Sequence, residues 1–184
     1  ALFILTITAS NSIAGGVVYN TNDSGFGSLR EACATGGMVS FSAALVVGGS
    51  VTITLNSEIV ISGDVTINGI MNAIDTVYVS GNNSSRIFRI SDSNTSTSVS
   101  YLNNLAMIDG NAGTSYGGAV SNSGCDLRLE NCMVRTSTAR WGGAINQYGG
   151  GSWNFDLTVN NSSFYDNTAT SYGGALHCSS SNAY

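Results

Sequence analysis

One five-residue phrase occurs three times in the second half of the chain and constrains the fold more than any other feature. Each copy has an aromatic residue, two glycines, an alanine and a branched apolar residue: YGGAV at 116–120, WGGAI at 141–145 and YGGAL at 172–176. A repeating unit of this length cannot bury its own apolar face. It becomes stable by stacking on neighbouring units, which is the organisation of a solenoid.

An asparagine precedes each copy of the phrase. Asn104, Asn131 and Asn161 come 12, 10 and 11 positions before the three aromatic residues. An apolar residue lies two positions before each asparagine, and another lies three positions after it. We therefore expect equivalent residues to stack in register at about 4.8 Å per coil of the solenoid, with the asparagines forming an amide ladder.

The phrase itself predicts two further ladders. The first glycines, Gly117, Gly142 and Gly173, permit the sharp corner that each coil must turn. The aromatic residues are predicted to form a structural stack at the same corner, and they are Tyr116, Trp141 and Tyr172. The alternative is that these rings face outward and form a platform for sugars.

The rest of the chain predicts short strands and one helix. Between residues 38 and 102, apolar segments of three to six residues alternate with turn signals. Ser28 with Glu31 three residues later forms a capping box, which predicts a helix near 28–35 with Leu29 on its buried face. We predict an all-β fold, a parallel β-helix of six or seven coils whose open end the helix covers. A β-sandwich is the alternative.

The chain is expected to form a single domain over residues 1–184. Residues 1–16 form an N-terminal strand or extension, 17–37 the cap region and 38–184 the coils, with the clearest repeats in 102–184. The apolar start of the chain also matches the end of a signal peptide, which is the alternative for residues 1–14. No apolar run approaches the 18 or so residues of a membrane-spanning helix.

Charge and cysteine content argue against several classes of protein. Charged residues are only 9% of the chain, lysine is absent and the net charge is −5, so no nucleic-acid partner is expected. With one histidine and no CxxC pair, no metal site or cofactor is expected. The four cysteines permit two disulfides, with buried free thiols as the alternative. They are Cys33, Cys125, Cys132 and Cys178.

No catalytic residue is predicted. Glycoside hydrolysis needs two carboxylates that face each other, whereas the carboxylates of this chain are scattered along it. Asp126, Arg128 and Glu130 share one face of a predicted strand, and we interpret them as a solvated, salt-bridged surface. The lone His177 is interpreted as structural.

Asn-x-Ser/Thr sequons permit N-glycosylation at six positions. Their number is close to that expected by chance in a chain this rich in asparagine, serine and threonine. They begin at Asn22, Asn82, Asn83, Asn94, Asn160 and Asn161.

Two segments resemble known families. Residues 20–33 (NTNDSGFGSLREAC) resemble the CSLREA-type N-terminal module of secreted bacterial β-helix proteins. The Gly-Gly-Ala-Ile phrases and the FYDN sequence at 164–167 resemble the repeats of polymorphic outer-membrane proteins, although 134–137 and 107–110 depart from the second motif. The resemblance implies a right-handed parallel β-helix, secretion to the exterior or the cell surface, and an adhesive role. It transfers no catalytic residue.

We therefore expect a non-catalytic, secreted structural or adhesive protein that self-associates as the subunit of an extracellular filament. The last phrase begins a coil that the chain barely continues, and the unpaired edge of such a coil templates another chain. The head-to-tail contact would form by strand addition of the apolar residues 1–14 or by direct stacking of the ends of two copies. The alternative is that the chain is a fragment of a longer protein. The alternatives are a polysaccharide-active enzyme and a carbohydrate-binding surface module, with glycans as partners.

Overall fold

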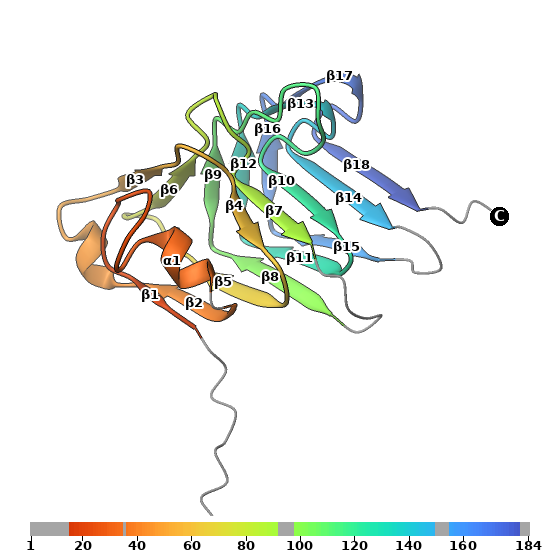
Figure 1. The fold of residues 1–184 in the computed structure, drawn as a ribbon. Coiled ribbons are helices and arrows are strands. Elements are labelled where there is room, and N and C mark those ends of the chain that lie inside the picture. The colour runs from red at the N-terminus through yellow and green to blue at the C-terminus, as the bar shows by residue number, and fades with distance from the viewer. Residues whose placement is uncertain (1–14, 35, 92–97, 150–154, 181–184) are drawn as a thin grey trace, which may run out of the picture.

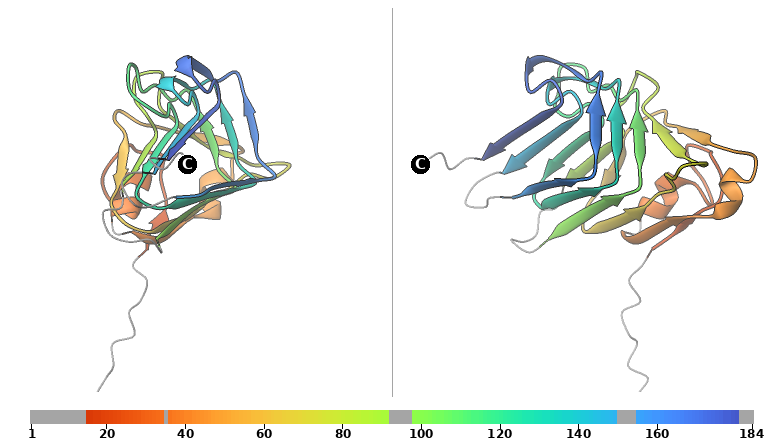
Figure 2. Two further views of the ribbon diagram at one scale, coloured as in Figure 1. Left: turned by 90° about the vertical axis from the view of Figure 1, so that its right-hand side faces the viewer. Right: turned by 180° about the vertical axis from the view of Figure 1, so that it is seen from behind.

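The computed structural model describes residues 15–34, 36–91, 98–149 and 155–180. These residues form a parallel β-solenoid of about five coils, which runs from the N-terminal cap to strand β18 (Figure 1). Viewed along its axis, the solenoid has a roughly triangular outline (Figure 2). The predicted all-β solenoid is confirmed, and the β-sandwich alternative is wrong because all the paired strands of its three main sheets run parallel.

Three parallel sheets form the sides of the triangle. Sheet A contains β1 (Val17–Val18), β2 (Gly37–Phe41), β5 (Val65–Asn68), β8 (Val99–Asn103), β11 (Asp126–Glu130) and β15 (Leu157–Asn160). Sheet B contains β3 (Val51–Thr54), β6 (Val77–Ser80), β9 (Ala106–Ile108), β12 (Met133–Arg135) and β16 (Ser163–Tyr165). Sheet C contains β4 (Ile59–Ile61), β7 (Phe88–Ser91), β10 (Val120–Ser123), β14 (Ile145–Gly149) and β18 (Leu176–Ser180). A short ladder of β13 (Thr138–Trp141) and β17 (Thr168–Tyr172) lies at the corner before sheet C.

The register of the strands matches the alignment of the repeats. Leu129 pairs with Leu102 on one side and with Val159 on the other. The apolar positions after the asparagines also pair, through β9, β12 and β16. The expected number of six or seven coils is too high, since each coil uses a strand from all three sheets and therefore takes up more of the chain.

The core fills the inside of the triangular tube. Phe88, Ile90 and Leu102 are fully buried there, because side chains alternate between the inside and the outside along each strand. Two amides also point inward: Asn122 donates to the side-chain oxygen of Gln147 over 2.7 Å, and both donate to the carbonyl oxygen of Cys125. These buried polar groups have hydrogen-bond partners, as stability requires.

The helix α1 (Leu29–Ala34) lies at the N-terminal end of the solenoid against β1, β2 and β4. Its Leu29 is fully buried, as predicted. The hydroxyl of Ser28 accepts a hydrogen bond from the Glu31 N–H at 3.2 Å, while the Glu31 carboxylate accepts one from the Gly27 N–H at 2.7 Å. The predicted capping box is therefore present, with its return bond one residue earlier than expected.

One arginine anchors this helix to the first coil. Arg30 donates to the carbonyl oxygens of Ser57 and Glu58 and forms an ion pair of 2.7 Å with Asp23. Asp23 in turn accepts a hydrogen bond from the backbone N–H of Asn56. Helix α1, the loop before it and the β3–β4 connection are thus held together. A second helical turn, η1 (Ala43–Val46), was not predicted.

The cysteines do not form the two disulfides that their number permits. Cys33 and Cys132 are buried free thiols, and Cys178 is an exposed free thiol. Cys125 is buried, with its sulfur 3.2 Å from the side-chain oxygen of Asn122. Burial raises the pKa of Cys33 to about 12, against the opposing charge of Arg30. Burial likewise raises the pKa of Cys132 to about 11.

Two expectations fall outside the described residues: the part of the predicted N-terminal strand that covers residues 1–14, and the sequon at Asn94. Within the described part of the chain, no helix is long and apolar enough to cross a membrane.

Candidate functional site

The aromatic residues of the three phrases stack at the corner that leads into sheet C. The ring centres of Tyr116 and Trp141 are 5.0 Å apart, and those of Trp141 and Tyr172 are 5.8 Å apart. The rings are tilted or edge-on, which suits the quadrupoles of aromatic pairs. The predicted aromatic stack is therefore present.

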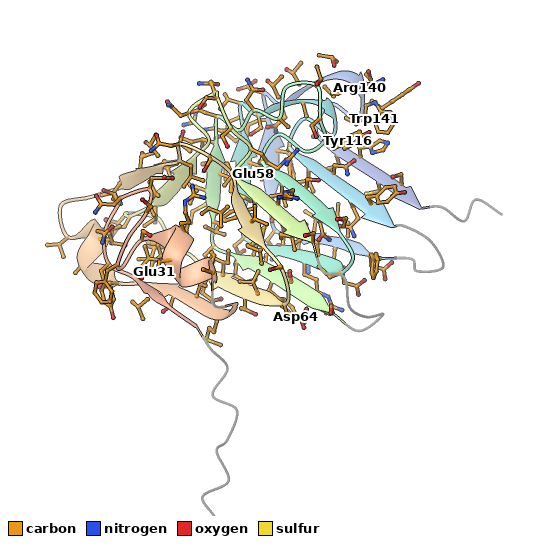
Figure 3. All side chains as sticks on the ribbon, in the orientation of Figure 1. Glu31, Glu58, Asp64, Tyr116, Arg140 and Trp141 are labelled. Carbon is orange, nitrogen blue, oxygen red and sulfur yellow. The ribbon has the colours of Figure 1, made fainter. Side chains whose placement is uncertain are left out.

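The same stack also faces solvent. Tyr116 is 40% exposed and Tyr172 is 64% exposed, while Trp141 is half-buried between them. The structural role and the outward-facing platform were predicted as alternatives, and the geometry combines them. Figure 3 shows Tyr116 and Trp141 together beside the C-terminal coils, far from Glu31 of the cap helix.

The first glycine of each phrase adopts the left-handed backbone conformation that forms the corner next to each aromatic residue. Gly117, Gly142 and Gly173 all have positive φ, between 60° and 65°. A Cβ atom on Gly142 would also overlap the carbonyl oxygen of Ile145. Only glycine satisfies both conditions, so the predicted glycine corners have a direct steric cause.

A groove runs over the outer face of sheet C beside the stack. Two rows of residues that pair in register form its floor: Ser121, Asn146 and His177 in one, Ser123, Tyr148 and Ser179 in the other. Asn146 is only 3% exposed. The groove has a volume of about 340 Å³. Its lining consists of Tyr116, Ser121, Ser123, Trp141, Asn146, Tyr148 and Ser179.

The lining combines aromatic rings with neutral polar groups. Tyr148 is 49% exposed and lines the groove together with Tyr116 and Trp141. The side-chain oxygen of Asn146 lies 2.8 Å from Nδ1 of His177, whose ring is 5.2 Å from that of Trp141. His177 is thus in contact with the groove lining, and its predicted structural role is compatible with this contact.

Basic side chains lie beside the groove. The Arg140 guanidinium is 5.4 Å from the centre of the Trp141 ring, and the Arg140 side chain is exposed. Arg86 donates hydrogen bonds to the carbonyl oxygens of Tyr116 and Gly117 at 3.0 and 2.9 Å. These bonds fix the backbone at the first aromatic corner.

Glu58 holds two arginines at once. It forms ion pairs with Arg86 and, over 2.8 Å, with Arg89. Burial lowers the pKa of Arg86, while the adjacent Glu58 carboxylate opposes that change. The ion pairs join residues about thirty positions apart, so no local sequence pattern predicts them.

The predicted asparagine ladder is only partly formed. Asn131 donates to the side-chain oxygen of Asn104 over 3.4 Å, a long hydrogen bond, whereas Asn161 donates to Glu130 over 2.7 Å. All three asparagines instead share a left-handed backbone, with φ of 51°, 52° and 46°. The common feature is therefore the backbone conformation rather than a continuous amide ladder.

The face shared by Asp126, Arg128 and Glu130 is occupied by local contacts. The Arg128 guanidinium lies 5.7 Å from the centre of the Tyr101 ring, and Asp126 accepts a hydrogen bond from the Asp156 N–H. None of the ion pairs between described residues joins Asp126, Arg128 and Glu130, so the predicted salt bridges on this face are wrong. Within the described residues, no group of three or more histidine, cysteine, aspartate or glutamate side chains could hold a metal ion.

The asparagines of the described sequons are all exposed on the surface. They are Asn22, Asn82, Asn83, Asn160 and Asn161.

Sequence reasoning missed the polar floor of the groove. Asn146 and Tyr148 follow the last residue of the second phrase by one and three positions, and Ser121 and Ser123 hold the same positions after the first phrase. Alternation along a strand that starts at the end of each phrase would have placed them on the outer face.

Comparisons of the chain with family models, with curated proteins and with solved structures find no match.

Proposed function

We propose that this protein is a non-catalytic, adhesive β-solenoid that binds carbohydrate in the groove on sheet C. The observation that carries the proposal is the aromatic row of exposed Tyr116, half-buried Trp141 and exposed Tyr172, which lies beside a floor of hydroxyl and amide groups. Exposed aromatic surface of this kind is typical of interaction sites, since burying it from water stabilises a complex.

The chemistry of the groove suits sugars. A pyranose ring has one apolar C–H face and a rim of hydroxyl groups. Tyr148 and the phrase aromatics supply ring surface for such a face, while the hydroxyl groups of Ser121, Ser123 and Ser179 supply hydrogen-bonding groups for the rim. Both kinds of group come from neighbouring coils in register, so the rigid solenoid holds them in place.

Binding without cleavage is the better supported activity at this groove. Glycoside hydrolysis requires a pair of carboxylates on either side of the scissile bond. The described residues that line the groove contribute aromatic, hydroxyl and amide side chains. We therefore propose recognition of a glycan rather than its hydrolysis, as in an adhesin.

A secreted or cell-surface location is part of the proposal. It is supported by the resemblance of residues 20–33 and of the Gly-Gly-Ala phrases to secreted bacterial β-helix proteins, and by a composition low in charge and rich in glycine, serine and asparagine. Polysaccharides are abundant outside the cell, so a sugar-binding surface would meet its ligands there.

Truncation of the aromatic lining tests the proposal. A glycan array first identifies bound sugars, and titration calorimetry with one of them then compares variants. We expect Tyr116→Ala and Tyr148→Ala each to weaken binding by about tenfold, the effect of losing one well-packed aromatic contact. Phe26→Ala is the matched control, because Phe26 is 85% exposed but belongs to the cap.

Thermal unfolding of each variant verifies that the solenoid is intact. Binding that both groove variants retain in full would contradict the proposed site. If the unaltered protein bound no glycan on the array, the proposed function itself would be wrong.

A further inference from the structure

We propose that the ligand is a linear anionic polysaccharide that lies along the solenoid axis, with Arg140 and Arg89 as the residues that recognise its carboxylate or sulfate groups. This inference rests on the proposed function and specifies the ligand class of the same groove. It follows from three features of sheet C and its edge: the direction of the rows, the position of two exposed guanidinium groups, and the charge of the lining.

The rows on sheet C give the groove a direction. Ser121, Asn146 and His177 belong to successive coils and are paired in register, as are Ser123, Tyr148 and Ser179. Equivalent groups therefore repeat at about 4.8 Å along the axis. This repeat is close to the length of one sugar unit in an extended chain, so a linear glycan could present the same group to each coil.

One exposed guanidinium lies at the aromatic wall. Arg140 is at the end of β13, and its side chain covers the Trp141 ring at 5.4 Å from the ring centre. None of the ion pairs between described residues involves Arg140. Stacking occupies one face of the planar guanidinium and leaves its N–H edge for a carboxylate or sulfate.

A second guanidinium continues the floor toward the N-terminal coils. Arg89 pairs in register with Ser121, so it is the next member of the row formed by Ser121 and Asn146. Its side chain is 48% exposed. Arg89 shares the Glu58 carboxylate with Arg86, so two positive charges face one negative charge and the group keeps a net positive charge.

The charge near the groove is opposite to that of the whole chain. The chain carries a net charge of −5, yet the residues that line the groove include no carboxylate and the charged group at its N-terminal side is cationic. The overall negative charge works against an anionic ligand at long range, so the preference depends on the two guanidinium groups beside the neutral lining, which complement anionic groups locally.

Pairs of glycans that differ only in charge test this inference. The probes are polygalacturonate oligosaccharides against their neutral methyl esters, and dextran sulfate oligosaccharides against neutral dextran. We expect the unaltered protein to bind the anionic member of a pair about tenfold more tightly at low salt. Arg140→Gln and Arg89→Gln should each reduce that preference about threefold, and about 1 M salt should remove most of it.

Arg128→Gln is the matched control. It removes the same charge from an exposed arginine, but Arg128 lies on sheet A and stacks on Tyr101, away from the groove. The inference is supported if Arg128→Gln keeps the preference that Arg140→Gln reduces. Arg89 also forms an ion pair with Glu58, so Arg89→Gln can lower the unfolding temperature. In that case the comparison of Arg140→Gln with Arg128→Gln tests the inference.

The outcomes separate this inference from the proposed function. Equal binding of anionic and neutral members, or binding of neutral glycans only, overturns the inference and leaves glycan binding intact. A loss of preference in Arg128→Gln equal to that in Arg140→Gln also overturns it, because overall charge would then explain the effect. Binding of no glycan at all overturns both. Preference for the uronate pair or for the sulfate pair identifies the anionic group.

Discussion

Single residues determine where each coil turns its corner. Asn104, Asn131 and Asn161 adopt a left-handed backbone, and five positions later Asp109, Thr136 and Asp166 do the same. The short sheet B strands lie between these paired corners. Asparagine and aspartate are among the few residues other than glycine that enter this region readily, because their short side chains bond to nearby backbone.

Substitutions at Asn131 distinguish the backbone role from the amide ladder. Its hydrogen bond to Asn104 is long, at 3.4 Å, so we expect the left-handed conformation to dominate its contribution. Asn131→Ala should lower the free energy of unfolding by about 1 kcal/mol, whereas Asn131→Gly should lower it by less. Chemical unfolding measures both. A loss in Asn131→Gly equal to that in Asn131→Ala would show that the amide ladder is the stabilising feature.

Asp23 should make the stability of the cap depend on pH. Burial raises its pKa, but the hydrogen bonds from Arg30 and Asn56 and the Arg30 charge outweigh this effect, so the pKa is lowered from its ordinary value of 3.8. Because the pKa is lower in the folded state, the ionised carboxylate stabilises the fold fully at pH values above its ordinary pKa of 3.8. That stabilisation is lost as the pH falls through the lower folded-state value.

Asp23→Asn tests this dependence. We expect the variant to unfold at a lower temperature than the unaltered protein at pH 6, with a smaller difference near pH 3, measured by circular dichroism. Asp156→Asn is the control, since Asp156 is an exposed carboxylate away from the cap. A difference that stays constant between the two pH values would rule out the proposed ionisation.

The sequence predicted residue positions better than residue roles. The spacing of Asn104, Asn131 and Asn161 identified a repeated structural position, but it could not distinguish an amide ladder from a left-handed corner. Residues in both roles recur at the same spacing. The Glu58 ion pairs with Arg86 and Arg89 left no local pattern, because they depend on which coil lies next to which.

At the scale of elements, the second glycine of each phrase controls how closely the coils stack. A Cβ atom on Gly118 would overlap the carbonyl oxygen of Gly143, and one on Gly143 would overlap that of Gly174. On Gly174 the nearest atom is the carbonyl oxygen of Asn167 at 3.8 Å, an ordinary contact. Neither Gly143 nor Gly174 has a positive φ, so they differ in neighbours rather than in conformational strain.

Gly143→Ala and Gly174→Ala therefore form a matched pair. Gly143→Ala must separate two coils, and we expect it to lower the free energy of unfolding by about 3 kcal/mol, as overpacking does in a close-packed interior. Gly174→Ala should change it by less than about 0.5 kcal/mol. Urea unfolding of the two variants measures the difference. Equal losses would mean that coil stacking is not the reason for the second glycine.

Elements that form through contacts between residues close in sequence were predictable. Features that depend on how residues of different coils pair were not. The capping box of Ser28 and Glu31 predicted α1 because its hydrogen bonds join residues within one turn. The groove depends on Tyr148, Ser123 and Ser179 coming together from three coils. Its floor becomes visible only when the coils are aligned, although the phrases already marked its aromatic wall.

At the scale of the whole molecule, the sequence repeat determines the type of fold but does not determine the number of coils. The phrase spacing predicted the solenoid and its stacking direction. The number of coils was overestimated, because strands such as β4 and β5 proved to be sides of the triangle rather than separate coils. The regular core and the exposed aromatic residues at one corner support the proposal that the solenoid is a rigid scaffold for an extended ligand.

Head-to-tail assembly through residues 1–14 stays a prediction of the sequence, and Gly174 provides a precise way to test it. Among the described strands, β15, β16, β17 and β18 pair on one side only. If a coil of another copy stacks on them, a Cβ atom on Gly174 would meet its backbone, as one on Gly143 would meet Gly174. We therefore expect Gly174→Ala to abolish filaments seen by negative-stain electron microscopy, while monomer stability and glycan binding are unchanged.

Deletion of residues 1–14 should have the same effect if that segment supplies the contact by strand addition. Arg128→Gln is the control and should leave filaments intact, since Arg128 lies on the side of the solenoid rather than at its end. Filaments in the deletion variant but not in Gly174→Ala would point to direct end stacking of coils. Filaments in both variants, or none in the unaltered protein, would refute the head-to-tail prediction and would not affect the proposed glycan binding.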